Sequence, residues 1–185
     1  MKIKKLSYVF AVLLLLGIWS ISPGWAQSKP TGSPPVITHS FAVEKGPYGY
    51  VWRLYIEAED PDGDMLKIAS VVRQTGYGHY PTDWIFLKPD QRRHLKGYIE
   101  WSTYSSKAPS LTEWTRITLT VSVLDQAGNE SNEVSFPFTF ESGVKNPYQY
   151  KAPPPFDQGN LPRLGRIFID LFEPLFMGGG DNRSD

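Results

Sequence analysis

The segment WTRITLTVSVLDQAGNESNEVSFPFTF, residues 114–140, predicts two β-strands joined by a tight turn. A residue period of two is typical of strands that have one buried and one solvated face. Between the two arms, Gly128 and Asn129 tolerate a positive φ, and Asp125 can hydrogen-bond the loop backbone. We therefore expect a β-hairpin against which the remaining chain packs. The alternating apolar residues of the two arms are Ile117, Leu119, Val121 and Val123, then Val134, Phe136, Phe138 and Phe140.

Similar alternation elsewhere in the chain predicts five further strands. The clearest case is Tyr50 to Ala58, where Trp52, Leu54, Ile56 and Ala58 share one face and Arg53, Tyr55 and Glu57 the other. Short strands separated by turns favour an all-β fold, which we expect to be an Ig-like two-sheet antiparallel sandwich. A small closed barrel is the structural alternative. The seven expected strands lie near residues 36–43, 50–58, 65–73, 84–87, 95–101, 114–124 and 133–140, within a domain of residues 36–141.

Length and charge limit the classes of protein to consider. The chain has 185 residues and a mass of 20.9 kDa, which suits one domain with tails. Its 19 basic and 19 acidic residues balance, but Lys2, Lys4 and Lys5 lie in the first 26 residues, which contain no acidic residue. Without that segment the 19 basic residues fall by three to 16, and the net charge becomes −3. This charge argues against a nucleic-acid partner.

Residues 1–26 have the pattern of a secretory signal peptide. A basic start precedes an apolar run from Leu6 to Ile21, and the small residues Gly24 and Ala26 lie close before the expected cleavage point. An uncleaved membrane anchor is the alternative, because the apolar run is long for a signal. We expect export to the periplasm or the extracellular space. The chain has no cysteine, so disulfides cannot stabilise it there.

The segments that flank the expected sandwich are polar or rich in proline and glycine. Residues 27–35 are predicted to form a linker and residues 142–160 a proline-rich spacer. Residues 177–185 are glycine-rich and are expected to be disordered. Residues 27–35 are too poor in apolar residues to pack.

Residues 161–176 are predicted to form an amphipathic helix outside the sandwich. Pro162 suits the first turn of a helix, and Pro174 suits its end. The apolar stripe of this helix is a candidate surface for a protein partner, and packing on its own sandwich is the alternative. Membrane contact is not favoured, because the polar side lacks a basic face. The candidate partner-docking residues are Leu164, Ile167, Phe168, Leu171, Phe172 and Leu175.

Two stretches together resemble the Ig-like and cadherin-like domains of bacterial surface proteins. The first is IEAEDPDGDML, residues 56–66, which is similar to strand B, an acidic turn and strand C of that family. The second is LTVSVLDQAGNES, residues 119–131, which is similar to strand F and the turn after it. The sequence PPVI, residues 34–37, is similar to the lead-in to strand A. The resemblance implies a β-sandwich used for interactions, although the family usually forms repeated arrays and this chain has one copy with an unrelated tail.

Four aspartates in the two turns form a candidate calcium site. In an Ig-type strand order both turns emerge at the same pole of the sandwich. Calcium takes about six to eight oxygen ligands, and the resemblance to cadherin-like domains implies that aspartates of such turns can supply them. Asp-Pro and Asp-Gly are also ordinary turn sequences, so a purely structural role stays open. The candidate ligands are Asp60, Asp62, Asp64 and Asp125.

Aromatic residues of a loop rich in glycine and tyrosine form a candidate glycan site. Tyr80 and Trp84 could stack on sugar rings, and the alternative is that these rings pack within the domain. No nucleophile elbow, zinc-binding helix motif or phosphate loop occurs, and His39, His79 and His94 are too scattered for a metal motif. We therefore expect no enzymatic activity.

These observations predict an exported, non-enzymatic interaction or scaffold module of the bacterial cell envelope. A secreted carbohydrate-binding or carbohydrate-active protein is the alternative. Calcium is the cofactor that the sequence suggests, and a protein is the partner that we expect, docked through the C-terminal helix or a face of the sandwich.

Overall fold

The computed structural model describes residues 31–109, 111, 115–144 and 150–174. The predicted signal peptide, residues 27–30 of the predicted linker and the predicted tail lie outside these residues. Within the described part, the chain forms ten strands and a three-residue 3-10 helix, η2 (Pro89–Gln91). The strands are β1 (Val36–Ala42), β2 (Lys45–Gly46), β3 (Val51–Glu59), β4 (Met65–Gln74), β5 (Gly78–His79), β6 (Asp83–Phe86), β7 (His94–Ser102), β8 (Arg116–Asp125), β9 (Val134–Phe140) and β10 (Arg163–Ile167).

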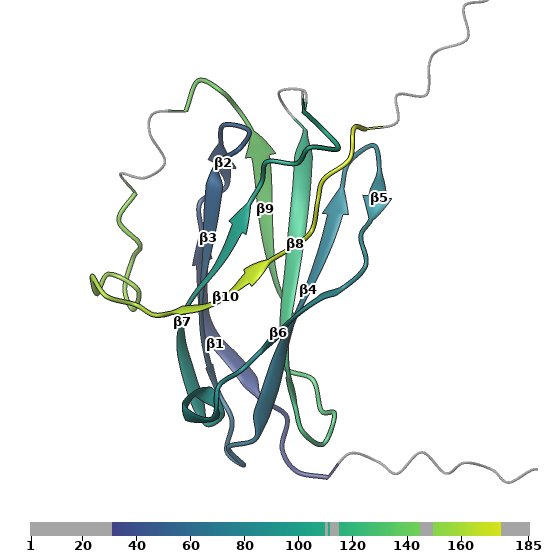
Figure 1. The fold of residues 1–185 in the computed structure, drawn as a ribbon. Coiled ribbons are helices and arrows are strands. Elements are labelled where there is room, and N and C mark those ends of the chain that lie inside the picture. Colours follow the sequence, from purple (N-terminus) through teal and green to yellow (C-terminus); the bar gives the residue numbers. More distant parts are fainter. Residues whose placement is uncertain (1–30, 110, 112–114, 145–149, 175–185) are drawn as a thin grey trace, which may run out of the picture.

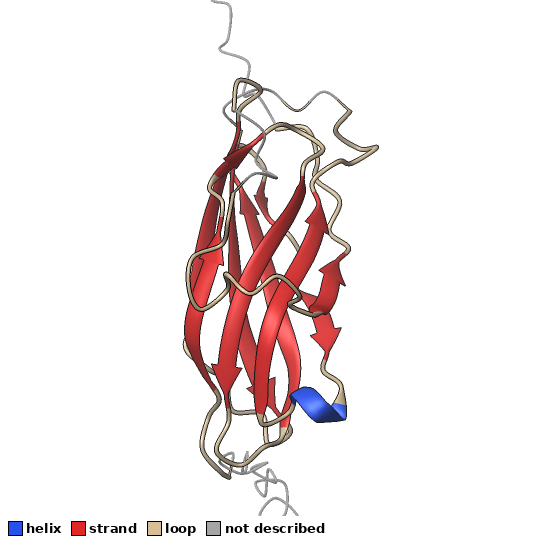
Figure 2. Cartoon of the chain, turned by 90° about the vertical axis from the view of Figure 1, so that its left-hand side faces the viewer, coloured by secondary structure: helices blue, strands red, loops and turns tan. Residues whose placement is uncertain are grey.

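The strands form two sheets, which run along the length of the molecule (Figures 1 and 2). The four-stranded sheet has the order β1-β3-β7-β10. In the other sheet the order is β2-β9-β8-β4, and both β5 and β6 pair with β4. This arrangement confirms the predicted all-β, Ig-like sandwich. All seven expected strands are present, and β2, β5 and β10 add to them.

One apolar core joins the inward faces of the two sheets. Trp52 of β3 and Trp101 of β7 lie in the four-stranded sheet, with ring centroids 6.2 Å apart. The Trp52 ring also lies 4.7 Å from that of Phe138 on β9 in the opposite sheet. All three side chains are fully buried, as is Leu119 of β8. Burial of these large apolar surfaces is the main source of stability for the sandwich.

The predicted helix over residues 161–176 is wrong over the residues that the structure describes. Arg163–Ile167 instead form β10, which pairs in parallel with β7 at the edge of the four-stranded sheet (Figure 1). A register shift between Arg163 and Gly165 marks a bulge in this pairing. Because a bulge adds one residue to a strand, Leu164 and Ile167 can both face the core although they are three positions apart. A bulged strand has thus produced a spacing that is also typical of a helix.

Both sheets are mixed, where the sequence predicted antiparallel sheets. Parallel pairing joins β10 to β7 and β2 to β9, and the other strand pairs are antiparallel. Parallel strands cannot be joined by a tight hairpin, and in the chain β8, β9 and the segment after them separate β7 from β10. In an Ig constant-type sheet of order A-B-E-D, the fourth place belongs to a strand from the middle of the domain. Here the C-terminal strand β10 occupies that place.

The described part of the chain contains no helix with the length and apolar character needed to cross a membrane.

Candidate functional site

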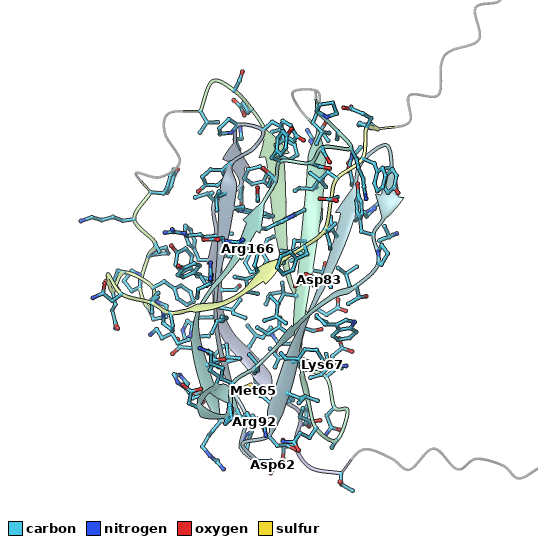
Figure 3. All side chains as sticks on the ribbon, viewed as in Figure 1. Asp62, Met65, Lys67, Asp83, Arg92 and Arg166 are labelled. Carbon is cyan, nitrogen blue, oxygen red and sulfur yellow. The ribbon has the colours of Figure 1, made fainter. Side chains whose placement is uncertain are left out.

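The two aspartate-containing turns meet at one end of the sandwich. Met65 at the start of β4 and Asp125 at the end of β8 are partners in the strand pairing. The backbone N–H of Gln126 also donates a hydrogen bond of 3.1 Å to the carbonyl oxygen of Asp64. Figure 3 shows Asp62 and Met65 toward this end of the molecule. The fold therefore brings the aspartates of the two turns into one cluster.

Two of these aspartates hold the turns through backbone hydrogen bonds. The buried Asp60, only 2% exposed, accepts hydrogen bonds from the backbone N–H groups of Asp62 (3.1 Å) and Asp64 (2.8 Å). The buried Asp125 accepts from the backbone N–H of Asn129 at 2.8 Å and from its side-chain amide at 2.7 Å. Both carboxylates thus have the structural role that Asx turns give to aspartate.

Asp64 is the aspartate of this cluster that has an unpaired buried oxygen. Its Oδ1 atom is buried and has no hydrogen-bond partner among the described residues. Burial, a hydrogen bond with Asp60 and the charge of Asp125 raise the pKa of Asp64. No group of three or more acidic or histidine side chains in the described part of the chain is arranged to hold a metal ion. Calcium binding by Asp60, Asp62, Asp64 and Asp125 stays a prediction.

Tyr80, one of the two candidate glycan-binding residues, is 6% exposed. Its hydroxyl donates a hydrogen bond to Oε1 of Gln74 and accepts one of 2.9 Å from the backbone N–H of Phe172. Its ring stacks on those of Tyr77 and Phe172, at centroid distances of 4.8 and 6.2 Å. Burial raises the pKa of Tyr80 to about 12. Tyr80 therefore joins the C-terminal segment to β4, and most of its ring surface is covered by its own domain.

Trp84, the second candidate glycan-binding residue, lies on β6 and is 42% exposed. The ammonium group of Lys67 lies 3.9 Å from the centroid of its ring. A cation over the ring face competes with a sugar for the same surface. Trp84 is thus partly accessible, on the side of the molecule that also exposes Phe86.

The six candidate partner-docking residues have different environments. Leu164, Ile167 and Leu171 belong to the core of the sandwich. Phe172 is partly buried against it, and Phe168 is 78% exposed. Leu175 lies outside the described residues. Leu164, Ile167 and Leu171 therefore pack on the chain's own domain and are not free to receive a partner.

An open groove of about 770 Å³ lies on the outer side of the four-stranded sheet. We call it the outer-face groove. Its floor is formed by outward-facing residues of β3 and β7, namely Arg53, Tyr55 and Tyr98. Its wall is the chain segment of residues 151–161, which leads to β10 and includes Lys151, Asp157, Gln158 and Asn160.

Aromatic contacts fix the shape of the outer-face groove. The ring of Tyr55 lies 5.9 Å from that of Tyr98 and 5.7 Å from that of Phe156. Phe156 is only 3% exposed, so it attaches the wall segment to the sheet. The guanidinium carbon of Arg53 lies 4.9 Å from the centroid of the Tyr98 ring. These contacts hold the floor and the wall in place before any ligand arrives.

Sequence reasoning placed part of this groove on a solvated face but did not identify it as a site. Arg53 and Tyr55 were expected on the polar side of their strand, where they lie. Tyr98 becomes their neighbour only through the pairing of β3 with β7, in which Tyr55 and Tyr98 are partners. The wall was expected to be an extended spacer. A tyrosine on the solvated side of a strand and a phenylalanine within a proline-rich segment were the available signals.

Cations of this sheet face form ion pairs outside the groove. Glu57 lies 3.5 Å from the ammonium group of Lys96, and 3.3 and 3.1 Å from ring nitrogens of His39 and His94. Glu100 lies 3.4 Å from Arg163 and 3.0 Å from Arg166, the β10 residue marked in Figure 3. Within the described part of the chain, the two cations that line the groove, Arg53 and Lys151, form no ion pair with a carboxylate.

No family model matches the chain, and the search of curated proteins gives no match. Among solved structures, the chain is similar to the CARDB domain of a Pyrococcus furiosus protein, which was crystallised in complex with di-metal ions. The likeness has a TM-score of 0.32 and 10% sequence identity, and it covers 57% of this chain and 91% of the other. The assignment of this chain to the β-sandwich class rests on its own sheet order and on the apolar core between its two sheets.

Proposed function

We propose that this protein is a non-enzymatic binding module, exported to the bacterial cell envelope, which holds its ligand in the outer-face groove. The observation that carries the proposal is the groove itself. Its volume of about 770 Å³ is in the usual range for ligand sites, and aromatic contacts form it in advance. Export is supported by the signal-like sequence of residues 1–26.

The position of the C-terminal segment also supports a sandwich face as the binding surface. Leu164, Ile167 and Leu171 are part of the core, so a projecting helix is not available for docking. The segment before them, by contrast, forms the wall of the groove. The C-terminal part of the chain therefore contributes to the site by completing it.

The charged groups in the groove favour binding over hydrolysis. Asp157 is the one carboxylate among the described residues that line it. Glycoside hydrolysis commonly uses a pair of carboxylates across the scissile bond. A groove with one carboxylate and two cations is better suited to holding a ligand than to cleaving one.

The proposal is tested by sedimentation of the purified mature protein with envelope fragments from the bacterium that produces it. We expect saturable binding, which falls about tenfold in a variant that carries Arg53→Gln and Lys151→Gln, because each replacement removes a charge-assisted contact. The matched control carries Arg73→Gln and Arg116→Gln, two exposed cations on the six-stranded sheet. The absence of saturable binding, or equal binding by all three proteins, would overturn the proposal.

A further inference from the structure

We propose that the ligand of the outer-face groove is an acidic saccharide, a chain of sugar units that carry carboxylate groups. This inference rests on the proposed function, since it names the chemical class that the same groove receives. It draws on three features of the groove: its uncommitted cations, the orientation of Arg53, and the polar side chains of the wall.

The unpaired cations of the groove favour a ligand that carries a negative charge. On the same sheet face, Lys96 pairs with Glu57, and Arg163 and Arg166 share Glu100, so each of these cations already has a carboxylate partner. Arg53 and Lys151 line the groove without a carboxylate partner in the described part of the chain. The groove therefore has two positive charges from its own residues and one negative charge, that of Asp157. Charge complementarity favours a ligand with at least one carboxylate.

Arg53 is held in a geometry that suits a carboxylate. Its guanidinium group lies over the ring of Tyr98, with the central carbon 4.9 Å from the ring centroid. A cation–π contact of this kind leaves N–H donors of the guanidinium available for a ligand. Those donors match the two oxygens of a carboxylate. Tyr98 thus holds the guanidinium of Arg53 beside the groove without using its hydrogen-bond donors.

The wall supplies the groups that recognise hydroxyls. Asp157, Gln158 and Asn160 are exposed and line the groove. Carboxylate and amide side chains both accept hydrogen bonds, and the amides also donate them, which suits the many hydroxyls of a sugar ring. The contact of Phe156 with Tyr55, with ring centroids 5.7 Å apart, fixes the middle of the wall segment, directly before Asp157. The ring of Tyr55 adds an apolar surface beside these polar groups.

Asp157 distinguishes a saccharide from an acidic peptide. A peptide rich in acidic residues would satisfy Arg53 and Lys151 but would bring further negative charge toward the Asp157 carboxylate. A sugar hydroxyl can instead donate a hydrogen bond to that carboxylate while the sugar carboxylate reaches the cations. The mixture of two cations, one carboxylate and two amides therefore favours the saccharide.

Isothermal titration calorimetry of the mature protein with defined oligosaccharides tests this inference. The acidic probes are oligogalacturonate, a hyaluronan oligosaccharide and sialyl-lactose, each compared with a neutral counterpart: methyl-esterified oligogalacturonate, a chitin oligosaccharide and lactose. An oligoglutamate peptide is the acidic, non-sugar comparison. We expect at least one acidic oligosaccharide to bind about tenfold more tightly than its neutral counterpart, because a charge-assisted contact is lost with the carboxylate.

Variants assign the binding to the groove. Arg53→Gln should weaken binding of the acidic probe about tenfold and leave the neutral counterpart unchanged, while Arg73→Gln on the opposite sheet should change neither. Asp157→Asn should raise the affinity for oligoglutamate relative to that for the saccharide. The inference is overturned if every acidic probe binds no better than its neutral counterpart, or if oligoglutamate binds as tightly as the best saccharide.

The results separate this inference from the proposed function. Groove-dependent sedimentation with the envelope, together with no preference for acidic saccharides, would contradict the inference and keep the binding module. Loss of that sedimentation after protease treatment of the envelope would identify a protein partner and would also contradict the inference. No groove-dependent sedimentation with the envelope would contradict the proposed function itself.

Discussion

The indole N–H of Trp101 donates a hydrogen bond of 3.0 Å to the backbone carbonyl of Ile169. This bond joins the middle of the four-stranded sheet to the C-terminal segment. The hydroxyl of Ser105 donates another, of 2.7 Å, to the carbonyl of Leu171. Because these are buried or partly buried donors, removal of the segment would leave both of them without an acceptor. The C-terminal segment is therefore a structural part of the sandwich.

Adjacent residues of this segment should differ sharply in their effect on stability. Ile167→Ala should lower the free energy of unfolding by about 2 to 5 kcal/mol, because it leaves a cavity in the core. Phe168→Ala removes a larger side chain that is 78% exposed and should change stability by no more than about 0.5 kcal/mol. Urea denaturation of both variants measures the difference. Equal losses would contradict the strand geometry of β10.

The close approach of β10 to β7 depends on a missing side chain at Gly97. A Cβ atom at this position would overlap the carbonyl oxygen of Pro162, which accepts a hydrogen bond of 3.0 Å from the N–H of Tyr98. Gly97→Ala should therefore destabilise the protein by about 1 to 3 kcal/mol through overpacking. Gly143→Ala is the control, because a Cβ atom there meets no atom within 4 Å. A Gly97→Ala variant as stable as this control would show that β10 can shift without cost.

The strands of the sandwich could be predicted because their signal is local. In β3, for example, Trp52, Leu54 and Ile56 alternate with polar residues, and each of the three is fully buried. The C-terminal segment lacks this alternation, because the bulge between Arg163 and Gly165 breaks the period of two. Its partner β7 is also remote in sequence, so only the assembled sheet selects a strand over a helix.

A candidate site could be predicted from the sequence where its residues lie in one turn or one strand, or in turns that the expected strand order brings together. The aspartates of the two turns come together because β4 pairs with β8, which follows from the Ig-type strand order. The outer-face groove needed the pairing of Tyr55 with Tyr98 and the return of the segment around Phe156 across the sheet. Neither contact has a signature within a short stretch of sequence.

Replacement of Tyr80 by phenylalanine tests its structural role. The change removes a hydroxyl that bonds both Oε1 of Gln74 and the backbone N–H of Phe172. Two buried or partly buried polar groups then lack a partner, so Tyr80→Phe should lower stability by about 1 to 3 kcal/mol. Tyr104→Phe, at an exposed tyrosine, should be neutral within about 0.5 kcal/mol. If thermal melting ranks the two variants the other way, Tyr80 does not hold the C-terminal segment.

The raised pKa of Asp64 predicts how stability depends on pH. The folded state holds the Asp64 proton more tightly than the unfolded state, in which the pKa of an aspartate is about 3.9. The stability that protonated Asp64 contributes is therefore fully present below about pH 4 and is lost as the pH rises through the raised pKa. Asp64→Asn, which stays neutral, should be more stable than the wild type at pH 7 and should lose that advantage at pH 3.5. Urea denaturation at the two pH values measures this difference, and an Asn variant that is less stable at pH 7 in the presence of chelator would contradict it.

The same variant decides the calcium hypothesis for the acidic turns. A bound calcium ion needs the ionised form of Asp64, and a ligand held only by the folded state raises the melting temperature. Calcium at millimolar concentration should then stabilise the wild type and reverse the order of the two proteins at pH 7, because Asp64→Asn lacks one charged ligand. If the melting temperature of the wild type is the same in calcium and in chelator, Asp60, Asp62, Asp64 and Asp125 do not form a calcium site.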